Sequence, residues 1–531
     1  MNERLVEDWL TKANERSYQT PFAQSLLADG MQVLRVAHSP HEHGKDIIAI
    51  DSEGKIHAFQ LKDGDFDLKD FERDLGQITA LVETPVEHPA ISGNPLHQPW
   101  LVVSGQTTTP VEDRIRVHNI QWRKRRCPTL KLIVGRQLAA KFSKMAENFW
   151  PQNPEDSHRL FNLYLADGKG NLDREAFAKF IASIVVIGGK TKKTDVARKI
   201  AAANLFASHA LSPFYTSKNY WEIIQGWTIT AAHIAWAAEE SGLADKIWRP
   251  TFQLAVNAAL TSLKALAEEA LQPNALRPGT FGELDEVTRS RCTICAGAIA
   301  MRILIARFTR EEWDQESPAK KMLEELFSHQ RLVIWGESAI PFLLAMMWAL
   351  DKLRGDQFSD KVLFAALAAV VQRNSGYLTP KLPLPYDSAD EANAKMFRRF
   401  FKGEKAMDIQ ASASYTLESL VTLVTRRMWR NGLAMFWSRI TKIALVRLVP
   451  DKPHDVLLWH WGYERGANQS RIFPPTQSWR ELLIESRQDE SGLLPHVIKD
   501  EFDFSLLFLL CFPHRLSRPL VKLFEDRTRY L

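Results

Sequence analysis

The chain has 531 residues, which is too long for one ordinary core and favours two or three domains. Its hydrophobic content of 45% and charged content of 25% are those of a folded globular protein and exclude a disordered chain. Four cysteines exclude a disulfide scaffold, and a net charge of +5 permits a nucleic-acid partner without requiring one.

Helical and extended patterns alternate over the first 150 residues. Apolar residues at helical spacing and a Thr-Pro helix start predict helices over residues 5–29, 67–83, 109 onward and 136–149. Runs of apolar and β-branched residues predict strands over residues 31–37, 46–50, 55–61, 100–105 and 130–134. The predicted order is α-β-β-β-α-β-α-β-α, which is typical of a compact α/β domain.

The stretch WPQNPEDS, residues 150–157, is the predicted boundary of this domain. Beyond it strand patterns nearly vanish and helical stripes dominate, so the fold class is an α/β domain followed by a large all-α region. A long loop at 377–394 divides that region into helical parts over 151–376 and 395–531.

Polar side chains gather on two of the predicted strands. Gln60 and Lys62 share one face of their strand, Asp46 begins the neighbouring strand, and Gly44 lets the backbone approach whatever binds there. Carboxylate and amide oxygens suit Mg²⁺, which takes one or two carboxylates and keeps several waters. The sequence therefore predicts a cleft in which Asp46 and Gln60 hold Mg²⁺ or Mn²⁺ and Lys62 orients or deprotonates a water.

The stretch GKDIIAID…HAFQLK resembles the PD-(D/E)xK nuclease superfamily, in particular the Mrr-like restriction endonucleases. The resemblance covers residues 1 to about 145 and implies a restriction-endonuclease-like αβββαβ core. It implies that Asp46, Gln60 and Lys62 are the catalytic residues, and it brings Gln77 of the following helix near the site.

The first helix departs from the pattern of that family. The position at which the resemblance implies a Glu is Gln19, followed by Pro21, and Glu15 lies one helical turn earlier. If the helix runs through Pro21, Glu15 could supply the carboxylate and join the metal ligands. If a new helix begins at Pro21, Glu15 points away and a degenerate nuclease becomes the alternative. His43 is a further candidate, as a solvated or phosphate-contacting loop histidine.

Basic residues are the candidates for contact with nucleic-acid phosphates. Lys45 lies beside the predicted catalytic Asp, and the RKRR run consists of Arg123, Lys124, Arg125 and Arg126. A solvated basic face is the alternative interpretation of such a run.

The predicted activity is metal-dependent endonuclease cleavage of DNA. By analogy it serves bacterial restriction or anti-phage defence, with the helical region sensing a signal, assembling as a homo-oligomer or binding a defence-system protein. One alternative is a catalytically inactive nucleic-acid-binding module on a helical interaction scaffold, and another is an RNase with the same core. The charged N-terminus and an apolar run of only twelve residues, 339–350, predict a cytoplasmic protein without a membrane partner.

Overall fold

The computed structural model describes residues 10, 15–36, 44–88, 91, 96–145, 168–185, 193–272, 275–276, 285–351, 357–375, 382, 385–402, 413–459 and 466–528. Packing divides the chain into two compact units, Met1–Ala258 and Ala259–Leu531. The division falls inside one helix, α10 (Asp245–Ala270). The predicted boundary at 150–157 lies outside the described residues and stays a prediction.

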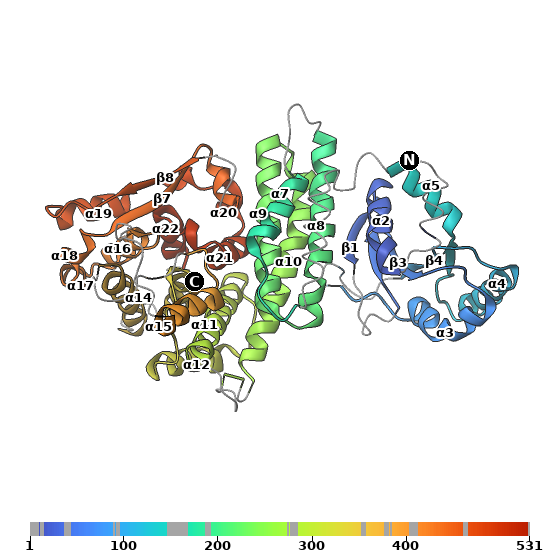
Figure 1. The fold of residues 1–531 in the computed structure, drawn as a ribbon, viewed down its shortest axis with the longest axis horizontal. Coiled ribbons are helices and arrows are strands. Elements are labelled where there is room, and N and C mark those ends of the chain that lie inside the picture. The colour runs from blue at the N-terminus through green and yellow to red at the C-terminus, as the bar shows by residue number, and fades with distance from the viewer. Residues whose placement is uncertain are drawn as a thin grey trace. The chain divides into compact units, whose positions relative to one another are not determined.

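The first unit begins with a mixed α/β region built on a five-stranded sheet of order β1-β2-β3-β4-β5 (Figure 1). The strands are β1 (Gln32–Val36), β2 (Ile47–Ile50), β3 (Ile56–Lys62), β4 (His97–Val103) and β5 (Lys131–Ile133). The helices are α2 (Glu15–Ala28), α3 (Leu68–Glu83), α4 (Thr109–Lys124) and α5 (Gly135–Met145). β1, β2 and β3 pair antiparallel, whereas β3, β4 and β5 pair parallel. The predicted order of elements is confirmed.

Successive side chains of β3 point to opposite faces of the sheet, and both faces carry apolar side chains. Helices cover each face and bury these side chains in two separate cores. Phe59 and Leu61 pack in one core with residues of α2 and α5. Ala58 packs in the other core with residues of α3 and α4, which lie side by side in Figure 1. Gln60 alternates with Phe59 and Leu61, so it belongs to the face that α3 covers.

The helix α2 runs through Pro21 as one element. Its Tyr18 hydroxyl donates one bifurcated hydrogen bond to the backbone oxygens of Lys62, at 2.7 Å, and Val102, at 3.2 Å. This bond anchors α2 to neighbouring strands at their carboxyl ends. Glu15 and Gln19 therefore lie on a continuous helix, and the interpretation in which a new helix begins at Pro21 is wrong.

The rest of the first unit is helical. Its further helices are α7 (Arg174–Val185), α8 (Lys193–Thr216), α9 (Tyr220–Ser241) and the first part of α10. The side chains of α9 are buried without interruption from Glu222 to Ala238, and α7 and α8 pack against it. A helix that is buried on every side needs cover around it, and α7 and α8 supply part of that cover.

The second unit is mainly helical but contains a small sheet. Its longer helices are α11 (Asp285–Thr309), α12 (Glu316–Ser328), α13 (Ile340–Ala349), α14 (Gln357–Ser375), α15 (Ala389–Lys402), α16 (Leu417–Arg426), α19 (Trp479–Arg487), α21 (Phe502–Cys511) and α22 (Arg518–Thr528). Short helices are η1 (Glu337–Ala339), α17 (Arg430–Ala434), α18 (Trp437–Ile440), η2 (Pro453–Leu457), η3 (Ser491–Leu493), α20 (His496–Asp500) and η4 (Pro513–Arg515).

The prediction of an all-α region is wrong between residues 413 and 471. There β6 (Ala413–Ser414), β7 (Ala444–Pro450) and β8 (Gly466–Arg471) form a three-stranded sheet. β8 reads GANQSR and is exposed over 467–470, so it carries no alternation of apolar residues that a sequence pattern could reveal. The predicted loop at 377–394 is also too long, because α15 begins at Ala389.

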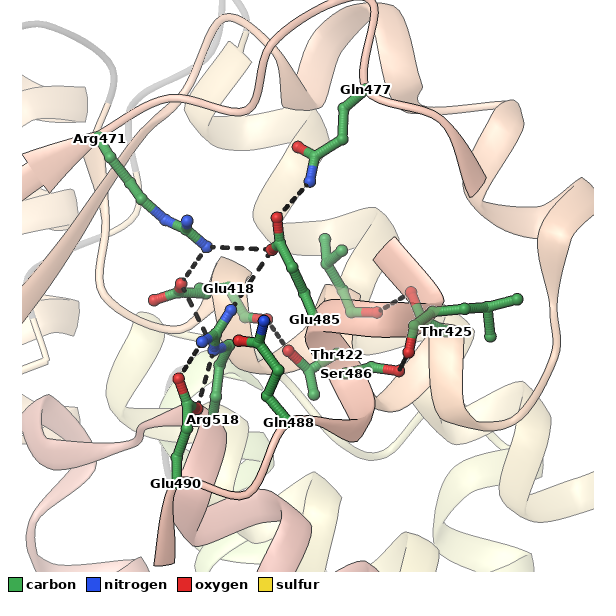
Figure 2. A network of polar contacts seen from close by, with 12 residues as sticks. Glu418, Thr422, Thr425, Arg471, Gln477, Glu485, Ser486, Gln488, Glu490 and Arg518 are labelled. Carbon is green, nitrogen blue, oxygen red and sulfur yellow. Dashed lines mark hydrogen bonds and ion pairs between the residues drawn. The ribbon is translucent and has the colours of Figure 1, made fainter. Parts of the chain in front are cut away.

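Ion pairs join four elements of the second unit around a cavity of about one water's volume (Figure 2). Glu418 of α16 contacts Arg471 of β8 and Arg518 of α22. Glu485 of α19 lies 3.7 Å from Arg471 and 3.4 Å from Arg518, and Arg518 also pairs with Glu490. Two arginines and three carboxylates in mutual contact thus tie these elements together.

One helix of the described residues, Glu286–Thr309, has the length and apolar composition to cross a membrane. Within its most apolar window 72% is buried inside the protein, against helices such as α12 and α13. The core helices of folded domains share these properties, so this helix is weak evidence for a membrane span.

Gly44 has a φ of +72° and approaches α3 closely. A Cβ built there would lie 2.6 Å from the backbone oxygen of Gln77, whereas a Cβ at Gly54, with a φ of +81°, meets nothing within 4 Å. We expect Gly44→Ala to destabilise the domain by about 2–4 kcal/mol, from backbone strain plus the clash with α3. Gly54→Ala should cost only about 1–2 kcal/mol from strain.

Urea denaturation of the two variants and the wild type, followed by circular dichroism, measures the difference. Equal midpoints for Gly44→Ala and Gly54→Ala would show that α3 does not pack against Gly44 as described.

Candidate active site

The Asp46 carboxylate is tied to the neighbouring strand. The pairing of Ile47 with Phe59 places Asp46 opposite Gln60, and the Asp46 N–H donates to the Phe59 oxygen at 2.8 Å. The N–H of Leu61 donates to Asp46 Oδ2 at 2.6 Å. The carboxylate therefore lies against β3 at the residue between Gln60 and Lys62.

Gln60 is buried, with 2% of its surface exposed, and only one end of its amide is bonded. Its Nε2 donates to Gln77 Oε1 at 2.8 Å. Its Oε1 is buried and has no hydrogen-bond partner among the described residues. A buried acceptor left in this state costs about 1–3 kcal/mol, so this oxygen is suited to a donor or a cation.

The Lys62 ammonium is surrounded by acceptors. Gln77 Oε1 accepts from Lys62 Nζ at 2.9 Å, Asp74 Oδ2 lies 3.3 Å from it and Glu15 Oε1 lies 3.7 Å from it. The lysine side chain is only 11% exposed, so these contacts are weakly screened by solvent. One oxygen of Gln77 thus orients both Gln60 and Lys62.

The two polar residues of the first helix reach the site in different ways. Glu15 lies beside Lys62, and burial raises the pKa of Glu15 despite the opposing effect of that lysine. Gln19 is buried and donates to the backbone oxygen of Asp46 at 3.4 Å, so it positions the strand carrying the carboxylate. The contact that the structure shows for Glu15 is with Lys62, and its predicted role as a metal ligand stays a prediction.

Asp74 of α3 is a site residue that the sequence analysis missed. Burial acts to raise the pKa of Asp74, but hydrogen bonds from Arg73 and Lys62 outweigh it and hold this pKa below the usual value. Asp74 lies three residues before Gln77, hence on the same face of α3. Because Gln77 was expected near the site, its three-residue spacing from Asp74 could have predicted that Asp74 lies there too.

The helix α3 lies over the two residues of β3 that the sequence predicts to point into a cleft. Gln77 and Asp74 lie over Gln60 and Lys62, and Gly44 brings the backbone close to α3 itself.

The predicted phosphate-binding residues fall into two groups. Lys45 is 4% exposed and donates to the backbone oxygen of Ala80 in α3 at 3.4 Å, which withdraws it from the surface. The four residues Arg123 to Arg126 are exposed at the carboxyl end of α4, with Arg125 paired to Glu83 at 2.8 Å. His43 lies outside the described residues.

The donor set at Asp46 fits a hard divalent cation that keeps most of its waters. Asp46 offers an anionic oxygen, and Gln60 Oε1 is a buried acceptor without a hydrogen-bond partner. Within the described part of the chain, no group of three His, Cys, Asp or Glu side chains is arranged to hold a metal ion. A site with one carboxylate and one amide therefore suits Mg²⁺ or Mn²⁺ better than a fully ligated structural metal.

Lys45 generates a prediction about pH. Burial lowers the pKa of Lys45 to about 8, with Glu87 offsetting part of the effect. Below pH 8 the folded protein carries the full cost of the buried charge, so Lys45→Met should raise the free energy of unfolding by about 1–3 kcal/mol at pH 7. Between pH 8 and 10 the unfolded state binds more protons than the folded state, so wild-type stability gains on the variant as the pH rises.

Urea denaturation at pH 7, 8, 9 and 10 tests this, with the exposed Lys55→Met as the control. DNA affinity should be unchanged in Lys45→Met. A stability difference that is independent of pH, or a loss of DNA affinity without a change in stability, would contradict the buried position of Lys45.

Comparisons with protein-family models, with curated proteins and with solved structures found no match for this chain. Functional inference therefore starts from the arrangement of the residues at Asp46, Gln60 and Lys62.

Proposed function

We propose that the N-terminal α/β region is a nuclease that hydrolyses phosphodiester bonds of DNA with Mg²⁺ or Mn²⁺. The observation that carries the proposal is the hydrogen bond from the Leu61 N–H to Asp46. It ties the carboxylate to the backbone of β3 at the residue that separates Gln60, whose Oε1 has no hydrogen-bond partner among the described residues, from Lys62. An anionic oxygen, a neutral oxygen and a cation on neighbouring positions are groups that suit metal-assisted phosphodiester hydrolysis.

Each residue has a separate task in this proposal. Asp46 and Gln60 Oε1 would hold the metal, which when bound polarises the phosphodiester and acidifies a water. Lys62, held by Gln77, places a positive charge where negative charge develops on the phosphate oxygens. Gln77 keeps the Gln60 amide turned so that its oxygen and not its nitrogen faces away from α3.

The finer assignment is a PD-(D/E)xK nuclease of the Mrr-like restriction endonuclease type. The order αβββαβ supports it, as does the placing of Asp46 directly before β2 and of Gln60 and Lys62 on β3, as an analogy of fold and motif. DNA is the favoured substrate, with the exposed run Arg123 to Arg126 available to phosphates. By the same analogy, the protein would act in the cytoplasm in restriction or anti-phage defence, and its helical part would serve in sensing or assembly.

A catalytically inactive nucleic-acid-binding module is the second candidate. Two observations favour it: Gln19 stands where the resemblance implies a carboxylate, and α3 covers Gln60 and Lys62. With Asp46 and Gln60 as the proposed ligands, one carboxylate holds the metal, so metal affinity is expected to be modest.

Cleavage assays separate these candidates. The full-length protein should degrade plasmid DNA with Mg²⁺ or Mn²⁺ and not with EDTA. Lys62→Ala and Asp46→Asn should each lower the rate by about 100-fold or more, because each removes a charge acting on the transition state. The exposed Lys55→Ala on the turn before β3 is the matched control and should cleave normally.

Melting curves and DNA-binding titrations of the same variants show whether fold and affinity persist. No cleavage of DNA by the wild type with either metal, together with retained binding, would favour the inactive module. Cleavage of RNA alone would make the protein an RNase, and equal DNA cleavage by Lys62→Ala would exclude this site.

A further inference from the structure

We infer that Asp74 is a positioning residue for Lys62, a role that rests on the proposed nuclease function. Asp74 Oδ2 lies 3.3 Å from Lys62 Nζ, and each of the two side chains is only 11% exposed. Asp74 touches the lysine and not the residues expected to hold the metal, so it acts on the reaction through Lys62.

The carboxylate of Asp74 is itself held in place. The Arg73 guanidinium binds it through two nitrogens, with Nε 3.1 Å from Oδ1 and a second nitrogen 3.3 Å from Oδ2. The helix α3 that carries it begins with a reciprocal capping box between Asp67 and Asp70. A rigid carboxylate at this position restricts a side chain that otherwise has four flexible carbons.

The charges around Lys62 make Asp74 the closest negative partner. Glu15 is farther away, at 3.7 Å, and Gln77 is neutral although it accepts at 2.9 Å. Asp63 follows Lys62 in the chain and acts electrostatically on Glu15, so it contributes to the field of the site. Without Asp74 the lysine keeps the neutral Gln77 oxygen and the Glu15 carboxylate at 3.7 Å, so its ammonium is restrained by fewer contacts.

A purely structural role for Asp74 would be the stabilisation of α3 through Arg73. Asp70 provides the matched comparison, because it pairs with the same Arg73 at 2.7 Å while only Asp74 is paired with Lys62. Asp70 also accepts from the Asp67 N–H in the cap of α3, so Asp70→Asn tests the contributions of Arg73 and of the cap. A loss that occurs in Asp74→Asn and not in Asp70→Asn therefore points to the contact with the lysine.

Cleavage kinetics give the first test. Asp74→Asn should lower kcat for DNA cleavage by about 10–100-fold, the range typical when an orienting partner is removed. The KM for DNA and the Mg²⁺ concentration for half-maximal rate should change by no more than about 2-fold, since neither is held by Asp74. Asp74→Glu should recover most of the rate, and Asp70→Asn should cleave as the wild type does.

A double-mutant cycle gives the second test. In a Lys62→Ala background, Asp74→Asn should cause no further loss, because its effect is transmitted through the absent lysine. An equal additional loss in that background would show that Asp74 acts through the fold and would overturn the inference.

Amine labelling tests the same contact without any need for cleavage. Acylation of Lys62 by a lysine-selective reagent, followed by mass spectrometry of the full-length protein, should be several-fold faster in Asp74→Asn than in the wild type or Asp70→Asn. If the wild type cuts no DNA, the proposed function fails while this labelling still decides the positioning role. Unchanged labelling of Lys62 in Asp74→Asn overturns the inference, whatever the cleavage rates. If Asp74→Asn does not melt cooperatively, the labelling is done on Asp74→Glu instead. This variant keeps a carboxylate at position 74, so Lys62 should be acylated as slowly as in the wild type, and faster acylation would overturn the inference.

Discussion

The hydrogen bond from the Leu61 N–H to the Asp46 carboxylate is the contact on which the rest of the site depends. It fixes the carboxylate against β3, where alternation places Gln60 and Lys62 on the two neighbouring positions of one face. The pairing of β2 with β3 therefore brings together a carboxylate, an amide and an ammonium group.

Helix α3 completes the cluster and also closes it. The single oxygen of Gln77 accepts from Gln60 and Lys62, and Asp74 pairs with the same lysine. Gly44 makes this possible, because its lack of a Cβ lets α3 approach the start of β2. The same closeness leaves Gln60 Oε1 buried without a hydrogen-bond partner, and a fold tolerates that cost most readily where a ligand relieves it.

The sequence predicted the α/β region well because its signals were local. Runs of apolar residues, a turn and helix caps marked each element, and a two-residue spacing put Gln60 and Lys62 on one face. The burial of Lys45 and the role of Asp74 depend on how α3 is rotated over the sheet, which helical periodicity alone does not determine. β8, at 466–471, is polar and was missed because its pairing with β7 leaves no trace in its composition.

The most direct measurement is the position of a bound metal in crystals of the full-length protein soaked with Mn²⁺. We expect an anomalous peak bonded to the Asp46 carboxylate and to Gln60 Oε1, with waters completing the coordination, and no peak there in Asp46→Asn crystals. A peak held by other residues, or an empty site at Mn²⁺ concentrations that support DNA cleavage, would contradict the assignment of Asp46 and Gln60 as the metal ligands.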